Sequence, residues 1–109
     1  MLRLKVMRIR IYSNDIEAPL TPFTGKFLAN VSLAIVSALK TPQPVRSLEL
    51  ELEGEQVRIR VNRIPVPMDL SRGFSRIIVL DTVRGMIRHL KMEDPGGRIR
   101  IEVETEPPP

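Results

Sequence analysis

The side chains that could carry out chemistry in this chain are few, and His89 is the only histidine among them. The chain has no cysteine, so neither a thiolate nucleophile nor a zinc set of histidine and cysteine ligands can be assembled. A serine–histidine pair would depend on His89 alone. A single histidine among the charged residues of a helix is usually a solvated side chain, and we therefore expect no bound metal and no cofactor.

Three carboxylates, Glu49, Glu51 and Glu53, alternate with leucines and are expected to share one face of a strand. Paired carboxylates perform acid–base catalysis when a cleft drives their pKa values apart. Here the next strand is expected to place arginines directly across from them, which favours ordinary ionised side chains. We interpret these glutamates as one side of a salt-bridge ladder.

The segment Pro95-Gly96-Gly97-Arg98 follows an expected helix and precedes an expected strand. A phosphate-binding loop has the reverse order, in which a strand leads through glycines into a helix. We interpret the segment as a turn. An acylphosphatase-like hydrolase would need a glycine-rich anion loop after the first strand, and residues 13–20 offer none. These patterns predict that the protein is not an enzyme.

Residues 44–62 give the clearest structural signal, a two-stranded hairpin whose apolar and charged residues alternate. Gly54-Glu55 fits a two-residue type II′ turn, with glycine at the first central position. One sheet face is then apolar, and the other is a lattice of glutamate and arginine. The expected cross-strand pairs are Leu50 with Ile59, Leu52 with Val57, Glu51 with Arg58 and Glu49 with Arg60.

The whole chain is expected to follow the order β-α-β-β-α-β, as a single α+β domain over residues 1–106. Strands are expected at 2–12, with a β-bulge near Met7, and at 98–104, and loops at 13–20 and 62–71. The resulting architecture is ferredoxin-like, an antiparallel sheet with two helices on one face. Residues 107–109 are expected to be a disordered proline tail.

A first helix is predicted over 22–40, with Thr21 as N-cap and Pro22 in the first helical position. Its expected apolar stripe contains Phe23, Phe27, Val31, Ala34, Ile35 and Ala38. Further apolar residues widen the stripe beyond what one sheet face requires, which indicates either a core of two helix layers or a self-association surface. The candidate surface residues are Phe27, Leu28, Val31, Ile35, Val36 and Leu39.

A second helix is predicted over 72–92, capped by Asp69 or Ser71, with Ile77, Leu80, Val83, Ile87 and Leu90 on its apolar side. Its basic residues lie mostly opposite. The spacing of Arg84, Arg88 and Lys91 predicts a basic ridge that could contact a protein partner or tRNA.

The composition agrees with a small folded domain, since 42% of the 109 residues are hydrophobic and the net charge is +4. The longest uncharged run, 27–39, is too short for a bilayer, which needs about 20 residues. We expect a cytoplasmic protein without a signal peptide or membrane contact. Thirteen of the 17 basic residues are arginine, which is typical of a thermophile protein or of a genome rich in GC.

Two segments combine features of a known family. Residues 44–54 place a proline and an Arg-Ser pair before an alternating strand that ends in a Leu-x-Gly turn, and residues 81–91 continue a Thr-Val pair into a helix that ends in lysine. They resemble the small dimerisation subunit of the KEOPS (EKC) complex, the Pcc-type or CTAG/LAGE family. The matching positions are Pro44, Arg46, Ser47, Gly54, Thr82, Val83, Ile87, Arg88, Leu90 and Lys91.

The resemblance covers about residues 2–92, and the extra strand and the residues flanking the Thr-Val pair, Leu80 and Arg84, depart from it. Both the standard subunit and a diverged paralogue therefore stay open. KEOPS makes the threonylcarbamoyl (t6A) modification of tRNA, and the resemblance implies a non-catalytic subunit that forms a homodimer. It also implies docking on the ATPase-fold catalytic subunit and contact with tRNA.

The alternative is a free-standing ferredoxin-like nucleic-acid-binding protein of a thermophile that uses its basic first strand and second helix. Proteins of this fold that read single-stranded RNA stack bases on aromatic residues of their central strands. The expected strand 57–61 has no aromatic residue, so contacts would be limited to phosphates.

Overall fold

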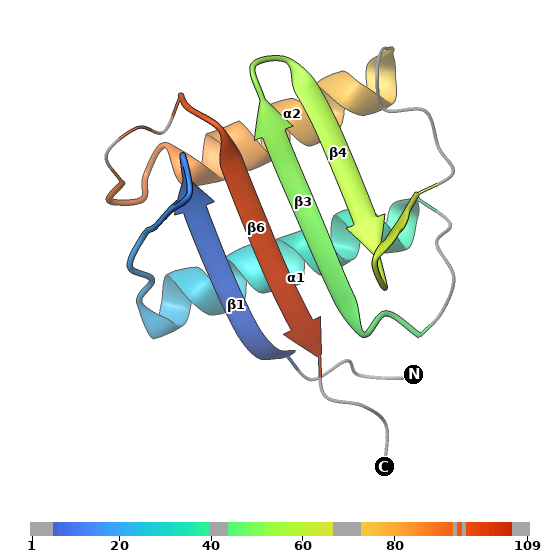
Figure 1. Cartoon of the computed structure of the whole chain (residues 1–109), viewed down its shortest axis with the longest axis horizontal. Helices are drawn as coiled ribbons and strands as arrows, with labels where there is room; N and C mark the ends of the chain where they lie inside the picture. Colours follow the sequence, from blue (N-terminus) through green and yellow to red (C-terminus); the bar gives the residue numbers. More distant parts are fainter. Residues whose placement is uncertain (1–5, 40–43, 67–72, 93, 95, 106–109) are drawn as a thin grey trace.

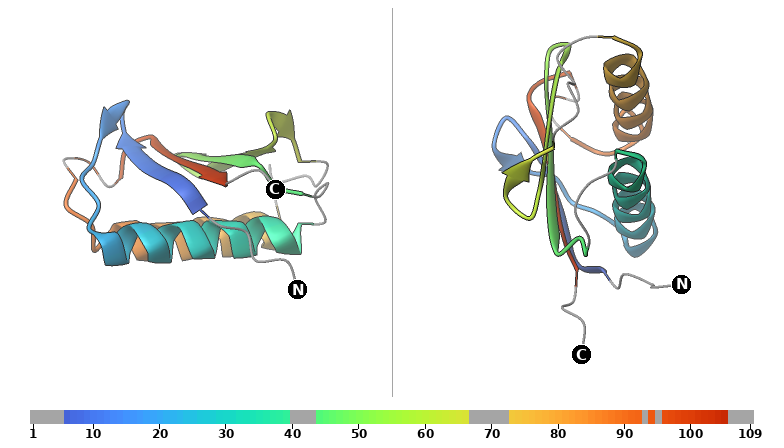
Figure 2. Two further views of the ribbon diagram at one scale, coloured as in Figure 1. Left: turned by 90° about the horizontal axis from the view of Figure 1, so that it is seen from below. Right: turned by 90° about the vertical axis from the view of Figure 1, so that its right-hand side faces the viewer.

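In the part of the chain that the structure describes, six antiparallel strands form a single sheet, and two helices lie against one of its faces (Figure 1, Figure 2). The computed structural model describes residues 6–39, 44–66, 73–92, 94 and 96–105. The sheet order is β2-β1-β6-β3-β4-β5. The elements are β1 (Val6–Ser13), β2 (Ile16–Glu17), α1 (Pro22–Ala38), β3 (Ser47–Glu53), β4 (Gln56–Val61), β5 (Ile64–Pro65), α2 (Phe74–Ile87) and β6 (Ile99–Thr105).

The predicted fold class is confirmed, because the structure is α+β, with an antiparallel sheet and two helices on one face. The long elements follow the predicted order β-α-β-β-α-β, and this arrangement is consistent with the ferredoxin-like type. The sheet has two short strands more than expected. The last strand, β6, is inserted between β1 and β3 and is antiparallel to both. Predictions for residues 2–5, 40, 67–72 and 106–109 lie outside the described residues.

The β3–β4 hairpin has the predicted register, including the pairs Leu50–Ile59 and Glu51–Arg58. Gly54 has a φ of 59°, and Glu55 is not among the residues with positive φ, as a type II′ turn requires. The predicted bulge in the first strand is also confirmed, because the pairing of β1 with β6 shifts between Val6 and Arg8. Alternation of apolar and polar residues was therefore enough to fix this half of the sheet.

Two segments predicted as loops contain short hairpins instead. After β1 the chain turns at Asn14 and Asp15, with φ values of 48° and 68°, and after β4 it turns at Asn62 and Arg63, with φ values of 53° and 67°. Two consecutive positive φ angles define a type I′ turn. The asparagine side chains stabilise these turns, since Asn14 Oδ1 accepts a hydrogen bond from the Arg98 amide at 2.9 Å and Asn62 Oδ1 accepts one from the Arg46 amide at 2.7 Å.

These paired turns reveal an internal repeat. The unit β1-β2-α1-β3 corresponds to the unit β4-β5-α2-β6, and the sheet order is unchanged when the two units are exchanged. The pseudo-twofold axis passes through the Leu50–Ile101 pair, where equivalent residues of β3 and β6 face each other. The two units can therefore be compared position by position.

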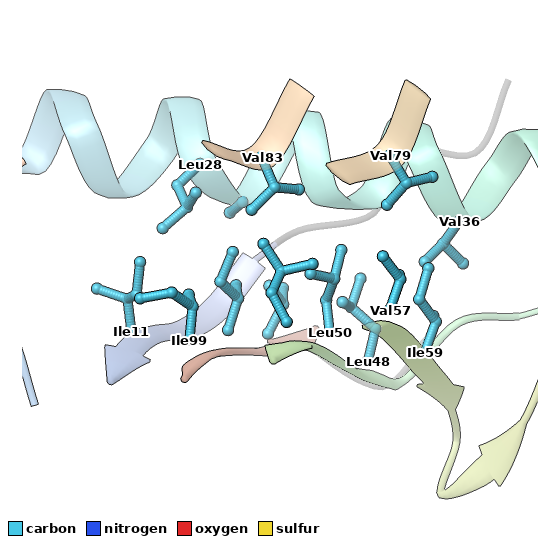
Figure 3. Packing of buried hydrophobic residues seen from close by; sticks show 14 of the residues in the cluster. Ile11, Leu28, Val36, Leu48, Leu50, Val57, Ile59, Val79, Val83 and Ile99 are labelled. Carbon is cyan, nitrogen blue, oxygen red and sulfur yellow. The ribbon is translucent and has the colours of Figure 1, made fainter. Parts of the chain in front are cut away.

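The core lies between the helices and the sheet (Figure 3). Alternate residues of the four long strands point into it, and they are almost entirely Leu, Ile and Val. From the helices, Leu28, Val36, Val79 and Val83 point down onto this surface. Burial of these aliphatic side chains is the main stabilising contribution, at about 1.5–3 kcal/mol for each fully buried one.

The rotation of α1 about its axis differs from the prediction. The predicted N-cap is confirmed, because the Thr21 hydroxyl and Thr24 form a capping box. The sheet-facing side, however, contains Gly25, Leu28, Ala29, Ser32 and Val36. The predicted stripe is wrong at four positions, because Phe23, Phe27, Ala34 and Ala38 are exposed. Small residues face the sheet because they let the helix backbone approach it closely, and the Ser32 hydroxyl is satisfied by the Leu28 carbonyl at 2.8 Å.

Helix α2 is shorter than predicted and begins after Gly73, which provides no side-chain cap. The predicted caps Asp69 and Ser71 lie outside the described residues. The helix buries Val79, Val83 and Ile87. The predicted apolar side is right at Val83 and Ile87, and Leu80 and Leu90 are half-buried and pack against the core, whereas Ile77 is 45% exposed. It ends at Ile87 rather than near residue 92.

Candidate partner surface

Large apolar side chains are exposed on the two helices, and we call this surface the helix-layer face. Five helix residues with large apolar side chains are at least 45% exposed, an unusual number for two surface helices of a monomer. Helix α1 carries a single charged residue, Lys26, along its 17 residues. The exposed residues that define the helix-layer face are Phe23, Phe27, Phe74, Ile77 and Ile78.

A groove of about 500 Å³ lies between the N-terminal half of α1 and the C-terminal half of α2. The Phe23 and Phe27 rings form one wall, with their centroids 6.1 Å apart. Polar groups occur only at a few positions, as in sites that bind an apolar body and orient it by its edges. The lining residues are Phe23, Thr24, Phe27, Leu28, Asp81, Thr82, Gly85, Met86, His89 and Leu90.

The predicted self-association surface is corrected by the burial of its members. Leu28 is 2% exposed, Val36 is fully buried and Leu39 is 6% exposed, so these three belong to the core of the monomer. Phe27 is exposed, and Val31 and Ile35 are half-buried. The physical reason is the rotation of α1, since the side with the smallest side chains packs on the sheet and leaves the phenylalanines outside.

The predicted basic ridge is only partly formed. Lys91 lies beyond the end of α2, so Arg84, Arg88 and Lys91 do not share one helix face. Arg84 donates a hydrogen bond to the Gly54 carbonyl at 2.9 Å, and Arg76 donates one to the Glu55 carbonyl at 2.9 Å. Both arginines therefore connect α2 to the β3–β4 turn. Arg88 and Lys91 are exposed.

His89 lies in the turn after α2, is exposed, and lines the groove. The Arg88 Nε donates a long hydrogen bond to His89 Nε2 at 3.4 Å. Within the described residues, no group of three or more His, Asp or Glu side chains is placed to hold a metal ion. The position of His89 is that of a polar group at the edge of an apolar groove.

The opposite face of the sheet is polar, and we call it the open sheet face. Its outer strands carry arginines and its inner strands carry glutamates, as in the row Arg10, Glu102, Glu49 and Arg60. Arg58 pairs with Glu53 at 3.2 Å in the same lattice. Directly opposed glutamates in the middle of the sheet would repel a phosphate backbone laid across this face.

One corner of the open sheet face contains a compact charge cluster. The Arg98 guanidinium donates a hydrogen bond to Asp15 and holds the pKa of that carboxyl below its usual value, and Arg100 adds a second hydrogen bond at 3.0 Å. Arg100 also lies over the Tyr12 ring, 4.3 Å from its centroid. These contacts fasten the β1–β2 turn to β6, so the cluster is explained by the structure of the turn.

Comparison of the chain with family models, with curated proteins and with solved structures finds no match in any of the three. No helix in the described ranges has the length and apolar character needed to cross a membrane. The function can therefore be inferred only from the residues and the structure of this chain.

Several members of the candidate surface were missed by the sequence analysis. Phe23 was assigned to the core stripe and Ile77 to the buried side of α2, whereas Phe74, Ile78 and Met86 were not singled out. The signal available was the pattern of small residues, Gly25, Ala29 and Ser32, which repeats with helical spacing and marks the side that packs closely.

Proposed function

We propose that the protein is a non-catalytic assembly subunit that docks on another protein through its helix-layer face. The observation that carries this proposal is the exposure of Phe23 and Phe27, at 74% and 51%, on the wall of the groove, while Phe74, at the start of α2, is 75% exposed. Exposed aromatic residues that surround an apolar groove are typical of protein interfaces, where they become the buried anchors.

In its specific form, the proposal is that the chain is the small dimerisation subunit of a KEOPS complex, or a paralogue of it. The support is the resemblance of residues 44–54, which contain β3 and the first residue of the turn after it, and of residues 81–91, which contain the second half of α2 and the residues that follow it. In this role the helix-layer face contacts the ATPase-fold catalytic subunit, in the cytoplasm. No cofactor and no catalytic residue are part of the proposal.

The proposal includes self-association. Of the predicted surface, Phe27, Val31 and Ile35 keep exposed apolar area on α1. We expect a homodimer at micromolar concentration, as measured by light scattering. A strict monomer at high concentration would leave the partner subunit as the sole occupant of the surface.

The second candidate is a free-standing nucleic-acid-binding protein, and the exposure of Arg88 and Lys91 after α2 is the observation that favours it. On this account the purified chain binds RNA, and log affinity falls with log salt concentration in proportion to the phosphates contacted. Arg88→Glu would abolish that binding. On the assembly account, isolated chain binds tRNA weakly, and Arg88→Glu impairs modification only within the complex.

Affinity purification from the native organism tests the assembly function. The wild-type chain should co-elute with an ATPase-fold tRNA-modification subunit, and the Phe23→Ser/Phe27→Ser variant should lose that partner while keeping its fold. Arg58→Ser, on the open sheet face, is the matched control and should retain the partner. Equal recovery of the partner with all three proteins would refute docking through the helix-layer face.

A further inference from the structure

A second groove lies on the other side of α1, where the helix meets the outer edge of β1. It has a volume of about 420 Å³. Because it combines an open strand edge with a helix, it differs in kind from the groove of the helix-layer face. We call it the β1 groove, and its lining residues are Val6, Met7, Arg8, Ile9, Gly25, Lys26 and Asn30.

Among the described residues, part of the outer edge of β1 has no strand paired with it. Strand β2 pairs with β1 only at Tyr12 and Ser13, and the Ile11 carbonyl accepts a hydrogen bond from Ala18 at 2.9 Å. Residues two apart in a strand point their backbone groups to the same side, so Ile9 presents its N–H and C=O to the same edge as Ile11. Between Val6 and Arg10, no other strand of the described chain lies beside this edge (Figure 1).

The internal repeat supplies a comparison for this edge. Gly25 of α1 corresponds to Arg76 of α2, and the Arg76 side chain bonds the Glu55 carbonyl next to the β4 edge. At the β1 edge, Gly25 has no side chain that could extend into the β1 groove, and it packs closely on the strand, since an added Cβ would lie only 3.3 Å from Ile9 Cγ2. An arginine side chain therefore occupies this position in the second unit, whereas the equivalent position in the first unit has no side chain and borders the β1 groove.

The charge of the β1 groove selects the class of occupant. Arg8 and Lys26 line it and both are exposed, and no acidic residue is among its lining residues. Met7 adds an apolar side chain that is 55% exposed. An extended chain that pairs with a sheet edge gains main-chain hydrogen bonds and places alternate side chains in the adjoining groove. Acidic side chains on such an extended chain would form ion pairs with Arg8 and Lys26.

We propose that the β1 groove binds an extended, acidic segment of a partner protein, which adds to the sheet as a strand beside β1. The segment's backbone bonds to Ile9, its apolar side chains contact Met7, and its carboxylates contact Arg8 and Lys26. This interaction goes beyond the assembly function proposed above, because it uses a different surface and does not require the helix-layer face.

The probes for the test are two labelled octapeptides, one repeating Glu-Glu-Val-Val and the other repeating Lys-Lys-Val-Val, so that each has charged side chains on both faces of an added strand. In fluorescence anisotropy the acidic peptide should bind and the basic peptide should not, and added salt should weaken binding. Lys26→Glu and Arg8→Glu should each reduce the affinity roughly tenfold, because an attraction is replaced by a repulsion. Gln56→Glu, at the position of β4 equivalent to Arg8, is the control and should change nothing.

Amide exchange locates the bound peptide. The Ile9 amide should exchange more slowly with the acidic peptide, whereas the Val57 amide, its equivalent on β4, should be unaffected. The proposal is overturned if neither peptide binds, if both bind equally, or if binding survives the charge reversals. It is also overturned if Ile9 is protected in a homodimer without peptide, since a second copy would then occupy the edge.

Discussion

The neighbouring residues Phe27 and Leu28 provide a sharp test of how α1 is rotated on the sheet. The sequence places both residues among the candidate surface residues and does not show which of them packs on the sheet. The structure assigns them opposite roles, with Leu28 at 2% exposure and Phe27 at 51%. Truncating each residue to alanine therefore reports which side of the helix packs on the sheet.

Leu28→Ala should destabilise the protein by about 2.7–5 kcal/mol, the cost of removing a fully buried leucine and leaving a cavity. A chain of 109 residues has a total stability of about 5–15 kcal/mol, so the loss is a large fraction of it. Phe27→Ala should cost no more than about 0.5 kcal/mol, as is usual for a surface substitution. Leu28→Ala, which removes the smaller side chain, should thus be more destabilising than Phe27→Ala.

Urea denaturation followed by circular dichroism measures both free energies of unfolding. The Leu28→Ala midpoint should fall with little change in the m-value, and the Phe27→Ala midpoint should stay near that of the wild type. Val36→Ala and Ile35→Ala repeat the comparison two turns further along α1, with the buried valine as the sensitive position. Equal losses at Phe27 and Leu28, or a larger loss at Phe27, would refute the rotation of α1 described above.

Further predictions concern the sheet. Reversing the charge of Glu51 alone should lower the free energy of unfolding by about 0.5–1 kcal/mol, because it pairs with Arg58 at 4.0 Å. Exchanging the charges of Glu51 and Arg58 together should be nearly neutral. A double exchange as costly as the two single changes added together would contradict their pairing. Because the pKa of Asp15 is depressed in the folded state, its ion pairs contribute fully to the free energy of unfolding above pH 3.8, the ordinary pKa. This contribution is lost as the pH falls through the folded-state pKa. The stability of Asp15→Asn should therefore decrease less than that of the wild type over this acidic range. Asn62→Ala should lower the free energy of unfolding by about 1–3 kcal/mol, because two backbone amides and the Pro44 carbonyl lose their hydrogen-bond partner. Asn62→Gly should recover part of this loss, since glycine tolerates the φ of 53°. Thermal melts of the two variants measure the difference.

The hairpin could be predicted from sequence in detail because its alternation excludes every register that would expose the leucines of β3, and the two-residue turn selects one of the remaining registers. A shift of one residue would place Glu49 and Glu51 in the core, and that cost removes the competing registers. The glycine at position 54 then fixed the turn. Here local pattern and tertiary structure depend on the same residues.

The rotation of α1 could not be predicted in the same way because the helix is apolar on two sides. When hydrophobicity does not distinguish the sides, packing distance decides, and the side with Gly25, Ala29 and Ser32 approaches the sheet most closely. The type I′ turns were missed because the residues with positive φ are the pairs Asn14-Asp15 and Asn62-Arg63, neither of which contains the glycine that is usual at the second position. The candidate surface shifted with the helix, because Phe27 of the predicted surface is exposed whereas Leu28, Val36 and Leu39 of that surface lie in the core.

The internal repeat was also missed, because the two units share positions of burial rather than long identical segments. The buried residues Leu28, Ser32 and Val36 of α1 correspond to the buried residues of α2, which are Val79, Val83 and Ile87. Only the sheet order makes the correspondence visible. The comparison matters for function because Arg76 occupies in one unit the position that Gly25 leaves without a side chain beside the β1 groove.

Hydroxyl-radical footprinting of the chain, alone and in its purified native assembly, tests docking through the helix-layer face most directly. We predict that Phe23 and Phe27 are oxidised rapidly in the isolated chain and are protected in the assembly. Tyr12, on the open sheet face, should be oxidised equally in both. Unchanged oxidation of the two phenylalanines, or protection of Tyr12 instead, would contradict docking through the helix-layer face.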